Sequence, residues 1–310
     1  MNISSEVNTT NEELNLVLFL KLVWARKILI ISITLFSAIF SVFYALSIPN
    51  IYTSSSLLAP AGSEDSLSSK LGAFSGIAGL AGVTLPKGSD KTPEALSRIN
   101  SYDFFINEFI PYINLEDLMA VKKWDYQSNT ITYNDKLYDA DLGKWVRKVK
   151  LPSKPKPSLQ EAYKVYLERI NTSQDPKTSF VAISINHQSP HLAKSWLEIV
   201  IKNINLHMKK LDKNLAENSI LFLNETALNT SKSQIKVVIS KLLEDQIQDL
   251  MLAEATDDYA FTRITSPIAP ERKSKPSRPV ICILITMLGA ILSIIIVMCS
   301  HYYSIYFRKA

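Results

Sequence analysis

Two long stretches without charge lie near the two ends of the chain. One runs from Ile28 to Ile48 and the other from Val280 to Ser300, and neither contains Asp, Glu, Lys or Arg. A bilayer core about 30 Å thick needs about 20 helical residues, and a soluble helix of that length would show a polar face. The pattern therefore predicts two transmembrane helices with one large loop between them. The first stretch is too long for the h-region of a signal peptide, and no small-residue cleavage site follows it.

The charges that flank the first stretch predict the orientation. Lys21, Arg26 and Lys27 precede it, and the first ionisable residue after it is Glu64. Cytoplasmic flanks collect Lys and Arg, so we expect both termini on the cytoplasmic side of the membrane and the loop on the outer side. The bases before Pro279 run against this rule, but long loops translocate largely regardless of charge. The expected division is 1–27, cytoplasmic N-terminus with an interfacial helix; 28–48, first span; 49–279, periplasmic α+β domain; 280–303, second span; and 304–310, cytoplasmic tail.

Inside the loop, alternating and helical patterns predict a mixed sheet with several helices. The apolar residues Val181, Ile183 and Ile185 alternate with polar ones, which is typical of a sheet strand. Ser158 is a favourable N-cap for a helix at 158–170. The remaining predicted elements are a strand at 50–60, a helix at 92–113, a strand-turn-strand at 130–139 around Asn134-Asp135, and a returning strand at 259–267.

The longest predicted element lies between the sheet strands. No glycine or proline occurs from His191 to Ser266, and apolar residues recur near helical spacing. A continuous helix over about 190–254 would be on the order of 95 Å long. It could not bury itself in one small domain, so we expect it to extend far from the membrane and to pack against neighbours. Residues 225–234 have a weaker pattern and could break it.

Six of the eight glycines fall between Gly62 and Gly88. Gly72, Gly76 and Gly79 would share one helical face, and such a face permits close contact with another subunit or with the membrane. A flexible surface loop is the alternative, because glycine disfavours helix.

A proline-rich segment at 266–279 precedes the second span. It holds four bases and the prolines Pro267, Pro270, Pro276 and Pro279. Prolines prevent a continuous helix and favour a stiff, extended connector, and the bases could meet lipid phosphates. An ordinary polar linker is the alternative.

Composition and motifs argue against several function classes. The net charge of +5 falls to about +3 over the loop, so no nucleic-acid surface is expected. The two cysteines, Cys282 and Cys299, lie in the second span. The four histidines do not form a metal-ligand pattern, and no Walker, G-x-S-x-G or H-E-x-x-H motif occurs. We therefore expect no catalytic residue, no cofactor and no metal.

Several segments resemble the Wzz family of polysaccharide co-polymerases, or chain-length determinants, of the Gram-negative inner membrane. "SPHLAKSWLEIVIKNIN" resembles the start of the family's long helix, and "LLEDQIQDLMLAEATDDYAFTRITSPIAPERKSKPSRP" resembles its closing helix, strand and proline-rich motif. "TPEALSRINSYDFF" is similar as well. The family's proline-rich pattern corresponds here to Pro267, Pro270, Pro276 and Pro279, and its span glycine to Gly289.

The resemblance implies a function. Members form ring-like homo-oligomers, act as non-enzymatic scaffolds on a Wzy-type polymerase, and set the chain length of lipopolysaccharide O-antigen or a related polysaccharide; contact with lipid-linked polysaccharide is a further expectation. Related tyrosine kinases carry a cytoplasmic ATP-binding domain, whereas about ten residues follow Ser300 here. The alternatives are a capsule or exopolysaccharide export adaptor and a periplasmic sensor module.

Overall fold

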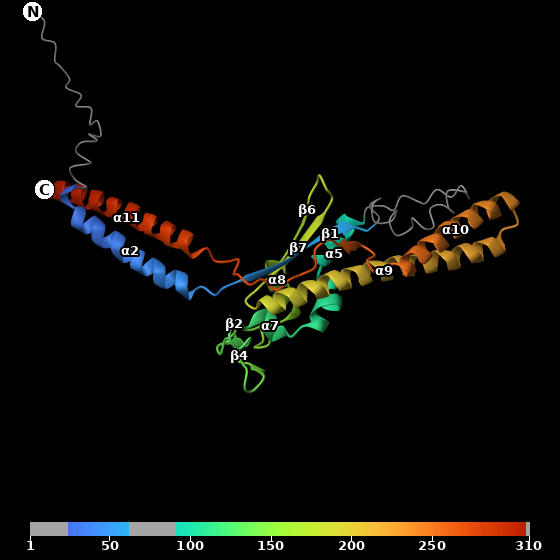
Figure 1. Ribbon diagram of the computed structural model, residues 1–310, viewed down its shortest axis with the longest axis horizontal. Helices are drawn as coiled ribbons and strands as arrows, with labels where there is room; N and C mark the ends of the chain where they lie inside the picture. The colour runs from blue at the N-terminus through green and yellow to red at the C-terminus, as the bar shows by residue number, and fades with distance from the viewer. Residues whose placement is uncertain (1–23, 62–90, 308–310) are drawn as a thin grey trace, which may run out of the picture. The chain divides into compact units, whose positions relative to one another are not determined.

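The computed structural model describes residues 24–61 and 91–307 (Figure 1). The chain divides into two compact units, and each is described by itself. The first holds the two apolar helices and comprises residues 1–49 and 275–310, while the second comprises residues 50–274.

The first unit is a pair of helices. Helix α2 spans Lys27–Ser47 and helix α11 spans Arg278–Phe307. Lys27–Ser47 and Arg278–Ser300 are long and apolar enough to cross a membrane. The two helices lie side by side (Figure 1). The predicted pair of terminal apolar helices is therefore confirmed.

The second unit is built around a four-stranded sheet in the order β6-β7-β1-β8. Its strands are β1 (Tyr52–Pro60), β6 (Ile170–Gln174), β7 (Val181–His187) and β8 (Phe261–Arg263). All three pairings are antiparallel, so the expected mixed sheet is wrong in this respect. Two small hairpins do not pair with this sheet; they are formed by β2 (Val121–Trp124) with β3 (Ile131–Tyr133) and by β4 (Tyr138–Asp139) with β5 (Lys144–Trp145).

Helices cover this sheet and close the core. They are α5 (Thr92–Ile99), α6 (Tyr102–Phe104), a π-helix (Phe105–Phe109), a 3₁₀ helix (Ile110–Tyr112), α7 (Leu115–Met119) and α8 (Leu159–Arg169). The single helix predicted at 92–113 is thus interrupted after Ile99, where Ser101 caps a new start. Ser158 caps α8 as predicted, because its hydroxyl accepts a bond from the Glu161 amide.

Helix α9 spans Pro190–Asn229 and α10 spans Ser233–Ala255. The expectation of one helix through residue 254 is wrong, since the helix is interrupted at residues 230–232 and α10 packs back along α9 (Figure 1). Lys213 pairs with Glu254 across the two helices. At 1.5 Å per residue, α9 is about 60 Å long. We call α9 and α10 together the helical hairpin.

Only the first half of α9 belongs to the core. Trp196, Val200 and Ile204 are buried at helical spacing and join the sheet residues in one cluster. Beyond Met208, the only α9 residue that is buried is Ala216. The distal half therefore contributes a surface rather than a core.

Two asparagines on α9 tie separate segments to the helix. The Asn205 side chain accepts bonds from the amides of Ala260 and Phe261, at 2.9 and 2.8 Å, and donates to the Phe261 carbonyl at 3.0 Å. Asn203 donates to the Glu108 carbonyl at 2.5 Å. Asn205 is buried, so it replaces water for three backbone groups where β8 begins.

Candidate functional site

The two apolar helices approach closely at one point. A Cβ atom placed on Gly289 would lie 2.2 Å from Ser37 Oγ and 2.4 Å from Ser37 Cβ. The Ser37 hydroxyl donates to the Ile285 carbonyl on the opposite helix at 2.9 Å. Apolar lipid provides little drive for helix association, so close packing of small residues and interhelical hydrogen bonds hold such pairs together. Gly289, which the sequence singled out, is therefore a contact residue of this pair.

The partner residues on α2 were not predicted. Ser37, Ser41 and Ala45 are four residues apart in turn, and Ser41 and Ala45 are buried. Small residues at this spacing lie on one helix face. The signal was therefore present in the sequence, on the first span rather than on the second.

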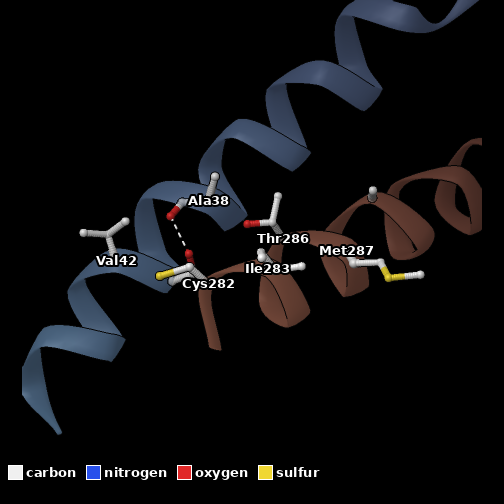
Figure 2. A pocket seen from close by; sticks show the side chains of 8 residues that line it. Ala38, Val42, Cys282, Ile283, Thr286 and Met287 are labelled. Carbon is white, nitrogen blue, oxygen red and sulfur yellow. Dashed lines mark hydrogen bonds between the residues drawn. The ribbon is translucent and has the colours of Figure 1, made fainter. Parts of the chain in front are cut away.

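A groove opens beside this contact, between α2 and α11 (Figure 2). Its volume is about 520 Å³. The Ser41 hydroxyl donates to the Ala38 carbonyl of its own helix at 2.7 Å, so it is not offered to the groove. This surface can receive an apolar group. It is lined by Ala38, Ser41, Val42, Cys282, Ile283, Thr286, Met287 and Ala290.

The chain that leaves β8 continues beside β1, and we call residues 264–274 the returning segment. The amides of Ile264 and Thr265 both donate to the Leu57 carbonyl, at 2.9 and 3.0 Å. Farther on, the Ser54 hydroxyl donates to the Ile268 carbonyl at 2.8 Å, and the Ser274 amide donates to the Ile51 carbonyl at 2.8 Å.

Proline has no amide hydrogen to donate, so Pro267 and Pro270 interrupt a backbone ladder in this segment, and the Ser54 hydroxyl instead joins β1 to the Ile268 carbonyl. The Ser56 hydroxyl likewise donates to the Thr265 carbonyl at 2.5 Å, and both serines are buried. Side chains of β1 thus hold the returning segment where a backbone ladder cannot continue. The polar run Ser54–Ser56 was a sequence signal for this contact that the prediction did not use.

The four prolines are divided between the two units. Pro267 is buried and Pro270 is half-buried, and both belong to the returning segment. Pro276 and Pro279 belong to the other unit, where Pro279 is the second residue of α11. Proline is favoured in a first helical turn because amide hydrogens there have no partner within the helix, so the absence of one costs nothing. The glycines Gly72, Gly76 and Gly79 lie outside the described residues.

One buried histidine joins three elements of the second unit. His187 Nδ1 accepts the Ser189 amide at 2.9 Å, so its Nε2 carries the proton and donates to the Asp117 carbonyl, also at 2.9 Å. Burial lowers the pKa of His187 to about 4. The imidazole is therefore neutral, and it links the end of β7 to α7 and to the start of α9. Among the described residues, no group of three or more His, Cys, Asp or Glu side chains could hold a metal ion.

These features define a class of protein: an α+β domain between two helices that could each cross a membrane. Residues 12–101, which include α2 and β1, match the model of the family described as Wzz, chain length determinant protein. The resemblance seen in the sequence is therefore confirmed for that segment. No curated protein matches the chain.

Solved structures also resemble the chain. A full-length bacterial polysaccharide co-polymerase is 13% identical, covers 93% of this chain and 97% of its own, and superposes with a TM-score of 0.40. A fragment of WzzB, a polysaccharide co-polymerase from Salmonella Typhimurium, is 15% identical and covers 73% of this chain and 100% of its own, with a TM-score of 0.30.

Proposed function

We propose that this chain regulates the length of a surface polysaccharide, such as lipopolysaccharide O-antigen, as an oligomeric scaffold on a Wzy-type polymerase. It acts without catalysing the polymerisation itself. The observation that carries the proposal is the Wzz match over residues 12–101. The matched segment includes the first apolar helix and the sheet strand β1, which pairs with β7 and β8.

In this proposal the domain of residues 50–274 lies in the periplasm and both termini lie in the cytoplasm. The basic residues Lys21, Arg26 and Lys27 before the first span support this orientation. Lys27 also lies over the Trp24 ring, with its Nζ atom 5.1 Å from the ring centroid. Aromatic and basic residues gather at membrane interfaces, so this pair would anchor the helix at the headgroups.

The helical hairpin supplies the surface for a ring of identical subunits. Leu221 and Phe222 on α9 are 68% and 67% exposed, and Val237 on α10 is 70% exposed. Large exposed apolar side chains gathered on one element commonly mark a protein contact. Packing hairpin against hairpin would bury them, and the groove between α9 and α10 lined by Leu215, Phe222 and Leu242 would be covered in the same contact.

Charged substitutions on this surface test the scaffold. In Leu221→Asp/Phe222→Asp, native mass spectrometry of the detergent-extracted protein should show loss of the oligomer, because two carboxylates would be buried without partners. The polysaccharide ladder should lose its preferred length in the same cells. Leu159→Asp on α8, where Leu159 is 40% exposed, is the matched control and should change neither. An unchanged mass together with an unchanged ladder in the double variant would contradict the proposal.

A further inference from the structure

Residues 142–156 form a basic loop around β5. Between Asp141 and Glu161 the chain has six bases and no acid. One base fixes the loop: Arg147 pairs with Glu161 at 2.5 Å and donates to the carbonyls of Pro155 and Lys154, at 2.7 and 3.0 Å. The loop therefore has a defined conformation that does not depend on its other charges.

The other five bases of the basic loop point to solvent. Each is exposed, and none has a salt-bridge partner within residues 24–61 and 91–307. Five positive charges without acids between them attract an anionic partner. The five are Lys144, Lys148, Lys150, Lys154 and Lys156.

Apolar side chains alternate with these lysines and are also exposed. Leu142 and Leu151 are 66% and 94% exposed, and Val146 and Val149 are 43% and 38% exposed. A hydrated anionic polymer would leave these side chains in water. At a bilayer surface, by contrast, aliphatic groups enter the headgroup region while lysine ammonium groups meet lipid phosphates.

An aromatic series supports the loop from the protein side. Trp145 packs edge-on against Tyr138, with ring centroids 5.2 Å apart, and Tyr138 packs against Tyr133 at 5.4 Å. The Tyr133 hydroxyl donates to Asp117 in α7 at 2.6 Å. The ring contacts of Trp145, Tyr138 and Tyr133 thus connect the basic loop to α7.

The domain can reach a bilayer, because only short segments of chain connect it to the two apolar helices. β1 begins five residues after α2 ends, and α11 begins four residues after the returning segment ends at Ser274. We propose that the basic loop docks on anionic phospholipid headgroups of the bilayer that holds the chain. This surface is independent of the helical hairpin and of the proposed role in chain length.

The test places a reporter at the most exposed apolar position of the loop. Leu151→Cys, in a Cys282→Ser/Cys299→Ser background, is labelled with an environment-sensitive fluorophore, and the full chain is placed in nanodiscs. In phosphatidylcholine nanodiscs that contain about 30% phosphatidylglycerol, the membrane surface is negatively charged. There the fluorophore emission should shift to the blue, and spin-labelled lipid should quench it. In phosphatidylcholine alone, neither change should occur. Leu228→Cys on α9, where Leu228 is 85% exposed, is the matched control and should not respond.

Charge reversal separates lipid docking from other causes. Each lysine near an anionic surface strengthens binding about fivefold, so Lys148→Glu/Lys150→Glu/Lys154→Glu should abolish the response, and so should 0.5 M salt, roughly five times the level at which the Debye length is 10 Å. Lys236→Glu/Lys241→Glu on α10 should leave it intact. Equal emission in the two nanodiscs would overturn the proposal. So would a response in phosphatidylcholine nanodiscs to added dextran sulfate, which would assign the loop to an anionic polymer instead.

Discussion

Replacing Gly289 by alanine should force the two apolar helices apart. The new Cβ would lie 2.2 Å from Ser37 Oγ, whereas non-bonded carbon contacts are favourable at about 3.5–4.0 Å. Restoring such a contact requires a local separation of roughly 1–2 Å, which would also break the hydrogen bond from Ser37 to the Ile285 carbonyl. Overpacking costs about 1–3 kcal/mol, and an interhelical hydrogen bond in a membrane contributes about 0.6 kcal/mol on average. We expect a total cost of about 2–4 kcal/mol for the association of the helices.

Two changes at Ser37 distinguish this mechanism from a general effect of alanine. Ser37→Gly removes both atoms that the new Cβ would meet first, and the next atom, Ser37 Cα, is 4.0 Å away. Gly289→Ala/Ser37→Gly should therefore restore the contact. Ser37→Ala retains the Cβ atom at 2.4 Å, so Gly289→Ala/Ser37→Ala should remain impaired.

Disulfide trapping measures the approach of the helices. Ser41→Cys and the native Cys282 both line the groove, so oxidation in a Cys299→Ser background should join α2 to α11. The cross-linked fraction, quantified by mass spectrometry after proteolysis of the denatured chain, should fall several-fold in Gly289→Ala and return only with Ser37→Gly. The reasoning would be refuted if Gly289→Ala gave the same cross-linked fraction as the wild type, or if Ser37→Ala restored that fraction as fully as Ser37→Gly.

Three further predictions concern the rest of the chain. Asn205→Ala leaves three buried backbone groups without partners at about 1–3 kcal/mol each, so it should lower the urea midpoint of the full chain in detergent far more than Asn203→Ala, which removes one bond. Burial lowers the pKa of His187 from 6.5 to about 4, so as the pH falls this histidine is protonated in the unfolded chain before it is protonated in the folded chain. The free energy of unfolding should therefore decrease by about 3 kcal/mol between pH 6.5 and 4. His187→Gln should make this decrease smaller, and an unchanged pH dependence would contradict the argument. Pro276→Ala/Pro279→Ala should broaden or shorten the polysaccharide ladder while the native mass stays constant, and an unchanged ladder would argue against a role for these prolines.

Local patterns predicted the elements whose formation depends on local chemistry. The apolar helices were predictable because 21 uncharged residues leave few alternatives in a bilayer. The strand β7 was predictable because Val181, Ile183 and Ile185 alternate and all face the core. Ser158 was predictable as a cap because a serine hydroxyl satisfies an amide at a helix start.

Features that depend on distant partners were not predictable from such patterns. The turn at Asn134 exists, but its two flanking strands pair with β2 and β5 rather than with each other, and single-strand patterns do not encode partners. The break at residues 230–232 lies in the stretch recognised as weak, yet helical periodicity cannot tell one rod from a hairpin. Asn205 looks like any polar residue on a helix, because its partners lie about 55 positions away in the sequence.

The most direct test of the proposed function is a gel of surface polysaccharide from host cells with and without the gene. If the chain sets polymer length, deletion should convert a clustered ladder into a smooth distribution weighted to short chains, and the intact gene should restore the cluster. Polymer that accumulates inside the cell and is absent from the surface would support the export adaptor. A ladder that does not change on deletion would contradict length control of that polymer.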